Sequence, residues 1–335
     1  MGREQRPGRK PPPRQALLGI AILAALVVVV AALTLLYRQG RLGSDRSTGK
    51  KEIEQSIGLI RQIAAAGDPL RLAEVLDGQM VAVPAGDFLM GSDRDRPDER
   101  PQRRVYLDGF EIDRYEVTNA QYRRFLESTG EAPPPHWQDG RYLQGQDDYP
   151  IVGVSWHEAD GYCRWAGKRL PTEAEWERAC RGTNARIYPW GDRWDPGRLN
   201  VDLTQHISED TGDEVFPWQA AWDLLQASPG SGVRPRLQPV GSYPGGASPY
   251  GILDTAGNAS EWVADWYNWT GYQALPDRNP LVAGPPWNHC VRGSAWYDTA
   301  GARGWAQTMS RCSARNSSHD SSDPRTGFRC ARSAS

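Results

Sequence analysis

One long apolar run stands out near the N-terminus of the chain. Residues 16–36 read ALLGIAILAALVVVVAALTLL, with no charged residue and a single hydroxyl group. A helix needs about 20 such residues to cross the hydrocarbon core of a membrane. A cleaved signal peptide has a shorter apolar region, of about 7 to 15 residues, followed by a small-x-small site. This run is longer and ends in Leu-Leu-Tyr-Arg, so we predict a transmembrane anchor over residues 16–37.

The segments on either side of the anchor are polar. Residues 1–15 are rich in proline and arginine and are predicted to form a disordered tail. Residues 38–79 begin as a polar linker, and from residue 51 their isoleucines and leucines approximate helical spacing, with a break at Gly67-Asp68-Pro69. We expect two short helices that form a stalk. The heptads are too few to establish a coiled coil that binds a partner.

The apolar pattern beyond residue 80 predicts short strands followed by capped helices. Residues 81–92 indicate two strands around a turn, and residues 106–118 indicate two more. Helix starts are marked by a hydroxyl residue followed three positions later by Glu or Gln, the spacing of a capping box. This spacing occurs at Thr118 and Gln121, at Ser155 and Glu158, and at Thr172 and Glu175. We expect the first helix to end near Ser128 and the second at Gly167.

The remainder of the chain indicates a fold rich in loops. After Gly182 the pattern predicts turns and short strands, with irregular stretches at 203–238 and 267–288. Such long structureless spans are uncommon in a compact domain, so residues 203–238 are either functional or an insertion. The chain has 35 glycines, 26 prolines, 14 tryptophans and 13 tyrosines, but 5 phenylalanines and 4 methionines. These features predict an α+β domain at 80–335 with a core built around aromatic residues.

Charge excludes one class of partner and leaves the topology open. The formal net charge is −2, which gives no reason to expect a nucleic-acid partner, because such binding requires a basic patch. Five lysines and arginines precede the apolar run and five follow it closely. The positive-inside comparison is therefore level.

Several segments together resemble the sulfatase-modifying-factor family, whose founding members are formylglycine-generating enzymes. They extend over about 250 residues in the family's order, so no single short pattern carries the resemblance. The segments are VPAGDFLMGS (83–92), DRYEVTNAQYRRFL (113–126), YPIVGVSWHEADGYCRWAGKRLPTEAEWERACRG (149–182), YPWGD (188–192), YGILDTAGNASEWVADW (250–266), VRGSAW (291–296) and GFRCAR (327–332). The resemblance implies a sulfatase-modifying-factor fold with a core related to C-type lectins.

Five cysteines lie in the domain, at positions 163, 180, 290, 312 and 330. Zinc sites favour cysteines two to four residues apart, and none of these is so close to another. The resemblance implies structural disulfides that join Cys163 to Cys330 and Cys180 to Cys312. Disulfides of this kind persist outside the reducing cytosol and favour an extracytoplasmic domain. The alternative is a cytosolic domain with buried free thiols.

The cysteine pair that the family uses for catalysis is missing. Counting forward from Gly293-Ser294 places the first catalytic cysteine at Tyr297, and counting back from Cys312 places the pair at Ala302 and Gln307. No cysteine occurs between residues 291 and 311. A thiolate is the nucleophile and the soft ligand for copper(I), so we expect no copper and no catalytic cysteine. Cys290 precedes the turn and is interpreted as a lone thiol, which leaves Tyr297 and Arg311 as the nearest catalytic candidates.

Two further positions depart from the family's substrate groove. Ser260 stands in GNASEW where the family has a tryptophan, and Arg325 stands where an asparagine commonly lines the pocket. With Ser294 of the GGS-like turn, these residues are our candidate groove. The changes add to the inference that formylglycine chemistry is lost.

The resemblance also implies structural calcium. In LDTAGNASEW the family's ligands map onto the side chains of Asp254 and Glu261 and the carbonyls of Gly257 and Ala259. Hard oxygen donors of this kind suit Ca²⁺. A second calcium site would begin at Asn200 and Val201, although its partners do not align through residues 203–238. Ordinary turn acids are the alternative for Asp254 and Glu261.

These observations favour a single-pass protein, of a bacterial inner membrane, with a cytoplasmic N-terminus and a periplasmic domain. We expect a pseudoenzyme that binds an envelope protein or peptide as an accessory to signalling or secretion. The alternative is a divergent oxidoreductase of the same family, acting on a protein or a small molecule.

Overall fold

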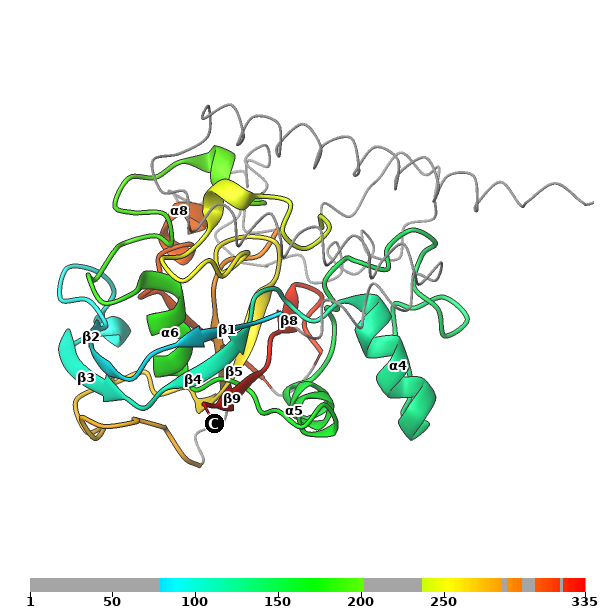
Figure 1. The fold of residues 1–335 in the computed structure, drawn as a ribbon, viewed down its shortest axis with the longest axis horizontal. Coiled ribbons are helices and arrows are strands. Elements are labelled where there is room, and N and C mark those ends of the chain that lie inside the picture. Colours follow the sequence, from blue (N-terminus) through cyan, green and yellow to red (C-terminus); the bar gives the residue numbers. More distant parts are fainter. Residues whose placement is uncertain (1–78, 202–236, 285–287, 297–304, 320–321, 335) are drawn as a thin grey trace, which may run out of the picture. The chain divides into compact units, whose positions relative to one another are not determined.

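The protein is described here by a computed structural model that covers residues 79–201, 237–284, 288–296, 305–319 and 322–334 (Figure 1). The predicted tail, anchor and stalk lie outside these residues, as do Tyr297 and most of the 203–238 stretch. Within the described part of the chain, no helix is both long and apolar enough to span a bilayer.

The first strands of the domain form two small sheets. β1 (Met80–Val83) pairs antiparallel with β4 (Phe110–Asp113), and β4 pairs on its other side with β9 (Ala331–Ser333), so the C-terminal strand lies beside an N-terminal one (Figure 1). β2 (Gly86–Met90) and β3 (Arg103–Leu107) form a separate antiparallel pair. The four strands predicted at 81–118 are therefore present. Each strand of the 81–92 segment pairs with a strand of the 106–118 segment.

Strands from residue 260 onward form a four-stranded sheet in the order β7-β6-β5-β8. Its strands are β5 (Ser260–Trp266), β6 (His289–Arg292), β7 (Arg315–Ser318) and β8 (Thr326–Phe328). β5 runs antiparallel to β6 and parallel to β8. The sheet thus brings the GNASEW segment next to the GFRC segment.

The three helix starts predicted from the sequence are confirmed. α4 (Asn119–Thr129), α5 (Trp156–Trp165) and α6 (Glu173–Arg181) each begin with the expected reciprocal capping box. α4 ends at Gly130, which adopts the left-handed conformation that glycine tolerates best. Shorter helical turns occur at η1 (Pro97–Glu99), η2 (Pro196–Arg198), η3 (Pro244–Gly246) and α8 (Trp305–Met309). The mixture of small sheets and few helices is the α+β class that the sequence predicts.

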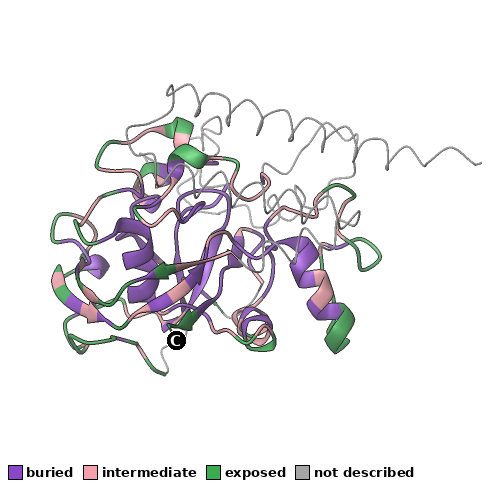
Figure 2. Cartoon of the chain, in the orientation of Figure 1, coloured by how far each residue is buried: buried purple, intermediate pink, exposed green. Residues whose placement is uncertain are grey.

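Aromatic residues form a large part of the core, as the composition predicts. Tyr122 of α4 stacks on Tyr162 of α5 with 5.8 Å between the ring centroids, and Phe328 of β8 meets the edge of both rings. Every residue of α6 is buried, including its charged ones (Figure 2). The burial of α6 makes it the central element on which the polar network described below is built.

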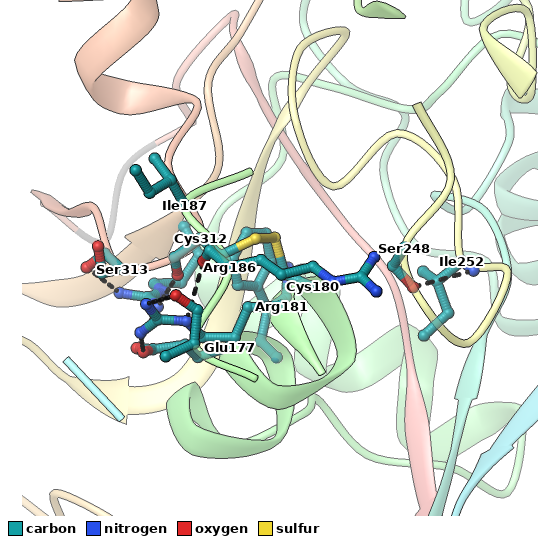
Figure 3. Close-up of a disulfide and its surroundings, with 12 residues drawn as sticks. Glu177, Cys180, Arg181, Arg186, Ile187, Ser248, Ile252, Cys312 and Ser313 are labelled. Atoms are coloured by element: carbon teal, nitrogen blue, oxygen red, sulfur yellow. Dashed lines mark hydrogen bonds and ion pairs between the residues drawn. A yellow bond between two sulfur atoms is a disulfide. The ribbon is translucent and has the colours of Figure 1, made fainter. Parts of the chain in front are cut away.

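Two disulfides tie the helices to the C-terminal segment. Cys163 of α5 is bonded to Cys330. Cys180 of α6 is bonded to Cys312, as Figure 3 shows. The Cys312 N–H also donates to the carbonyl of Ile187, with 2.8 Å between the atoms. Both predicted pairings are therefore present, and the elements that they join are far apart in sequence.

Candidate functional site

The free cysteine lies inside the protein. Cys290 is on β6, fully buried, and its thiol donates to Glu173 Oε1 at 3.0 Å. Burial raises the pKa of this thiol well above its ordinary value, and the neighbouring Glu173 carboxylate adds to the effect. Because the thiolate is the reactive form, Cys290 has neither the access nor the ionisation of a catalyst.

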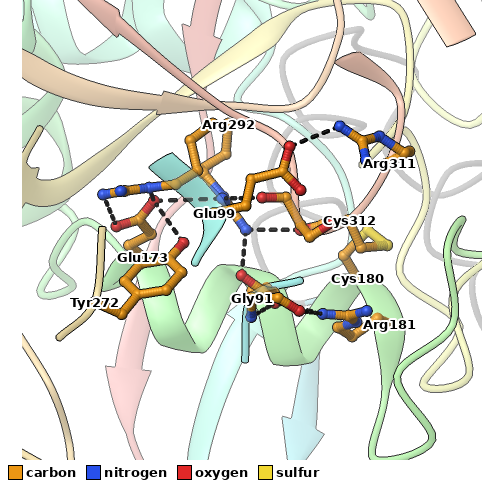
Figure 4. A network of polar contacts seen from close by, with 12 residues as sticks. Gly91, Glu99, Glu173, Cys180, Arg181, Tyr272, Arg292, Arg311 and Cys312 are labelled. Atoms are coloured by element: carbon orange, nitrogen blue, oxygen red, sulfur yellow. Dashed lines mark hydrogen bonds and ion pairs between the residues drawn. A yellow bond between two sulfur atoms is a disulfide. The ribbon is translucent and has the colours of Figure 1, made fainter. Parts of the chain in front are cut away.

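Through Glu173, Cys290 belongs to a buried network of ion pairs. Figure 4 shows Glu173 and Arg292 in this network. Arg315 donates to both oxygens of Glu173, at 2.6 and 2.8 Å, and Arg292 Nη1 lies 3.3 Å from Oε1. Burial alone would raise the pKa of Glu173, but Arg315 and Arg292 hold it below its ordinary value. Arg292 Nη2 also donates to Glu177 Oε2 at 2.7 Å. The network connects α6 to β6 and β7, where it acts as a structural support.

Arg311, one of the nearest catalytic candidates, is held in a second set of ion pairs. Its Nη2 lies 2.6 Å from Glu99 Oε1, and its Nη1 pairs with Asp95. Burial raises the pKa of Glu99 to about 7. Arg311 is itself almost buried and so is poorly placed to meet a substrate. Tyr297, the other candidate, lies outside the described residues.

The three candidate groove residues differ in how accessible they are. Ser294 is fully buried, where its hydroxyl accepts from the Gly257 N–H at 2.8 Å and pairs with Ser310. Ser260 is nearly buried, and its hydroxyl lies 3.0 Å from that of Thr326. Arg325 is partly exposed, with its guanidinium held by Asp323 at 3.0 and 3.1 Å. Arg325 is therefore the member of this set that is best placed to contact a partner.

The Glu261 side chain is already engaged by protein groups. Arg329 donates to each of its oxygens at 2.7 Å, and the Trp176 indole N–H donates to Oε2 at 2.8 Å. Glu261 and Arg329 are both fully buried. The pair thereby fixes the GNASEW segment to the GFRC segment.

Asp254 has a carboxylate neighbour that the sequence did not single out. Asp254 has a φ of 60° and its Oδ2 accepts from the Gly241 N–H at 2.6 Å. Its carboxyl group lies near that of Glu116, a residue between β4 and α4, and the two groups affect each other's pKa. Burial raises the pKa of Glu116 well above its ordinary value, and the nearby Asp254 adds to this. Glu116 is part of the DRYEVTNAQY motif, so its position was visible in the sequence but its neighbour was not.

The two predicted calcium segments contact each other. The Asn258 N–H donates to the Asn200 carbonyl at 2.9 Å, and Asn200 Nδ2 donates to Asn258 Oδ1 at 3.0 Å. A Cβ added to Gly257 would meet the Asn200 backbone at 2.7 Å, so this approach requires glycine. Val201 is the last residue described before residues 202–236, and no further ligand of the second site was identified from the sequence.

The buried acidic side chains of this region outnumber the buried basic ones, an arrangement that would suit a bound cation. Three buried carboxylates, from Glu116, Asp254 and Glu261, interact with one buried guanidinium, that of Arg329. Buried charges without partners are costly, and a divalent ion would offset the excess. Among the described residues, no group of three or more His, Cys, Asp or Glu side chains is arranged to hold a metal ion. A calcium site here would therefore depend on backbone carbonyls as well as carboxylates, which is usual for this ion.

A surface hollow of about 450 Å³ lies away from all these residues. It is lined by the β2–β3 pair and a neighbouring loop, through Asp87, Arg103, Arg104, Tyr106, Asp277 and Arg278. None of the predicted site residues contributes to it.

Comparisons with known proteins agree with the geometry of the fold. The family described as Sulfatase-modifying factor enzyme 1-like domain matches residues 69–334. The formylglycine-generating enzyme of Bos taurus is 33% identical over 302 residues, which cover 76% of this chain and 74% of the relative. The inactive C-alpha-formylglycine-generating enzyme 2 of Mus musculus is 31% identical over 309 residues, covering 79% and 89%. Among solved structures, PvdO from Pseudomonas aeruginosa has a TM-score of 0.56 at 27% identity, covering 77% and 95%. The chain therefore belongs to the sulfatase-modifying-factor family.

Proposed function

We propose that this domain has lost formylglycine chemistry and acts by binding a protein or peptide of the cell envelope. The observation that carries the proposal is the lack of any cysteine between residues 291 and 311. The nearest thiol, Cys290, is buried and donates to Glu173, so it does not replace the missing pair. The retained scaffold, with both disulfides and the buried ion pairs, keeps a rigid surface available for binding.

The proposal includes the placement of the domain outside the cytoplasm. The apolar run at 16–37 would anchor the chain in the membrane, with the N-terminus on the cytoplasmic side. The disulfides support this topology, because such bonds are rare in the reducing cytosol. An accessory role in signalling or secretion at the envelope is consistent with this arrangement.

The direct test is to offer the full-length, detergent-solubilised protein a cysteine-containing sulfatase peptide together with copper(I). We expect no aldehyde by mass spectrometry, with an active formylglycine-generating enzyme as the positive control. Aldehyde formation would overturn the proposal.

Binding itself is tested by crosslinking in native membranes. The variant Arg325→Ala removes the accessible groove residue, and Arg332→Ala removes an exposed arginine of β9 that pairs with Glu111 on β4. We expect capture of a defined partner to fall in the first variant and persist in the second. Equal capture of the partner by both variants would mean that the partner does not bind through Arg325 of the candidate groove.

The second candidate function is a divergent oxidoreductase. It is favoured by the identity to a relative named formylglycine-generating enzyme. That identity is 33%, compared with 31% to the relative named inactive. Redox chemistry would then have to use groups other than a cysteine pair, for which Tyr297 and Arg311 are the nearest residues. Copper or iron retained by the purified protein would support this function over the binding one.

A further inference from the structure

The interactions of Glu261 raise the question of which carboxylates serve the predicted cation site. Both oxygens of Glu261 accept charge-assisted hydrogen bonds from Arg329, and one accepts a third from Trp176. Arg329 also donates to the carbonyls of Asp113, Arg114 and Leu253. A cation that took Glu261 as its main ligand would compete with the guanidinium for these oxygens. Glu261 is thus better suited to anchoring the loop.

Glu116 has the free acceptor that Glu261 lacks. The residue is 1% exposed, and its Oε1 accepts from Asn258 Nδ2 at 3.1 Å. Its Oε2 is buried and has no hydrogen-bond partner among the described residues by distance and angle. Buried polar atoms in native proteins are nearly always satisfied by protein, water or an ion. The unsatisfied oxygen belongs to the carboxyl group that contacts Asp254.

Asp254 and Glu116 come from different parts of the chain. Asp254 precedes β5, whereas Glu116 lies just before the cap of α4, and Asn258 connects the two by its hydrogen bond to Glu116. Asn258 also bonds to Asn200, so the two predicted calcium segments and Glu116 form one continuous polar cluster. A cation held there would be bound by the N-terminal and central parts of the domain together.

We infer that Glu116, together with Asp254, supplies the carboxylate oxygens for a calcium ion at loop 254–261, and that Glu261 serves as the anchor of Arg329. The carbonyls of Gly257 and Ala259, which the family resemblance implies as ligands, complete a hard oxygen set of the kind Ca²⁺ prefers. Two carboxylates side by side in a buried site are stabilised by a divalent cation, since each compensates one of its charges. The inference rests on the predicted calcium and does not depend on what the domain binds.

The decisive variants are Glu116→Gln and Glu261→Gln in the full-length protein. A glutamine at 116 can still accept from Asn258 and can donate its amide N–H to Asp254, so the variant should fold and unfold at a higher temperature without calcium. A glutamine at 261 leaves Arg329 without its charged partner, and we expect it to lower the unfolding temperature. The two substitutions therefore have opposite effects on the calcium-free protein.

Calcium titration then separates the roles. Thermal unfolding and isothermal calorimetry at constant pH should detect calcium binding in the wild-type protein. We expect calcium affinity to fall by at least about tenfold in Glu116→Gln, given that even residues one step removed from a metal change affinity by about 10- to 100-fold. Glu261→Gln should keep its calcium-induced rise in unfolding temperature.

Asp265→Asn is the matched control for general destabilisation. Asp265 is buried and accepts from the N–H groups of Glu173 and Val282, neither of which is a proposed ligand. This variant should be less stable and yet bind calcium like the wild type. Unchanged affinity in Glu116→Gln would overturn the role of Glu116, and no calcium binding by the wild-type protein would overturn the site as a whole.

Discussion

Removal of the Cys180–Cys312 bridge should cost the domain a large part of its stability. The two disulfides are nested, because Cys180 and Cys312 both lie within the loop closed by Cys163 and Cys330. With the outer bridge intact, the inner one closes a ring of about 35 residues, which the chain-entropy relation makes worth about 4 kcal/mol. Without the outer bridge the same pair would close a loop of 132 residues, worth about 5 kcal/mol.

The assay is equilibrium unfolding of the variant Cys180→Ala/Cys312→Ala under oxidising conditions. A loss of about 4 kcal/mol would lower the unfolding temperature by roughly 8 to 16 °C for a domain of this size. The same sample should be mapped by peptide mass spectrometry without reduction, where Cys163 should remain joined to Cys330. Cys290→Ala is the control, since it removes a buried sulfur without opening a ring.

Two results would refute this reasoning. A variant within about 1 kcal/mol of the wild type would mean that the bridge does not constrain the unfolded chain as the entropy relation requires. Alkylation of all five cysteines in protein that has been unfolded but not reduced would mean that neither bridge forms. The second result would also remove the support that the disulfides give to an extracytoplasmic domain.

Two other measurements test the electrostatics and the topology. Burial raises the pKa of Asp265 to about 7, with Glu173 adding to the shift, so the folded protein holds this proton more tightly than the unfolded chain. The contribution of Asp265 to the free energy of unfolding should therefore decline as pH rises from about 4 to about 7. The free energy of unfolding of Asp265→Asn should depend less on pH over that range. The same pH dependence in both proteins would contradict the raised pKa of Asp265. A reporter fused after Ser335 should be active only as an exported protein, and reporter activity in the cytoplasm would reverse the predicted topology.

Local sequence signals predicted the helices well. Each capping box involves residues three positions apart, so both partners are visible in a short stretch of sequence. The strand segments at 81–118 were also visible, but their pairing was not, because β4 takes one partner from residue 80 onward and the other from residue 331 onward. Pairing over such distances leaves no mark in the local pattern.

The buried charges were the least predictable part of the structure. The positions of Glu173, Arg292 and Arg315 in the sequence follow no pattern that predicts contact between them. In its own segment, each resembles an ordinary polar residue. Glu116 was quoted within a family motif, but its contact with Asp254 depends on the packing of a loop 138 residues further on. The disulfide pairing was obtained from the family resemblance, since the cysteine spacings alone fit several connectivities.

The position of β9 has a consequence for the order of events during synthesis. This strand (Ala331–Ser333) completes the sheet that contains β1 and β4. Cys330, next to it, is the last cysteine and closes the outer disulfide. β4 is therefore synthesised more than 200 residues before the strand that pairs with its second edge. Until β9 is made, that second edge of β4 lacks its partner, and an unpaired strand edge of this kind favours pairing with other chains, which chaperones prevent.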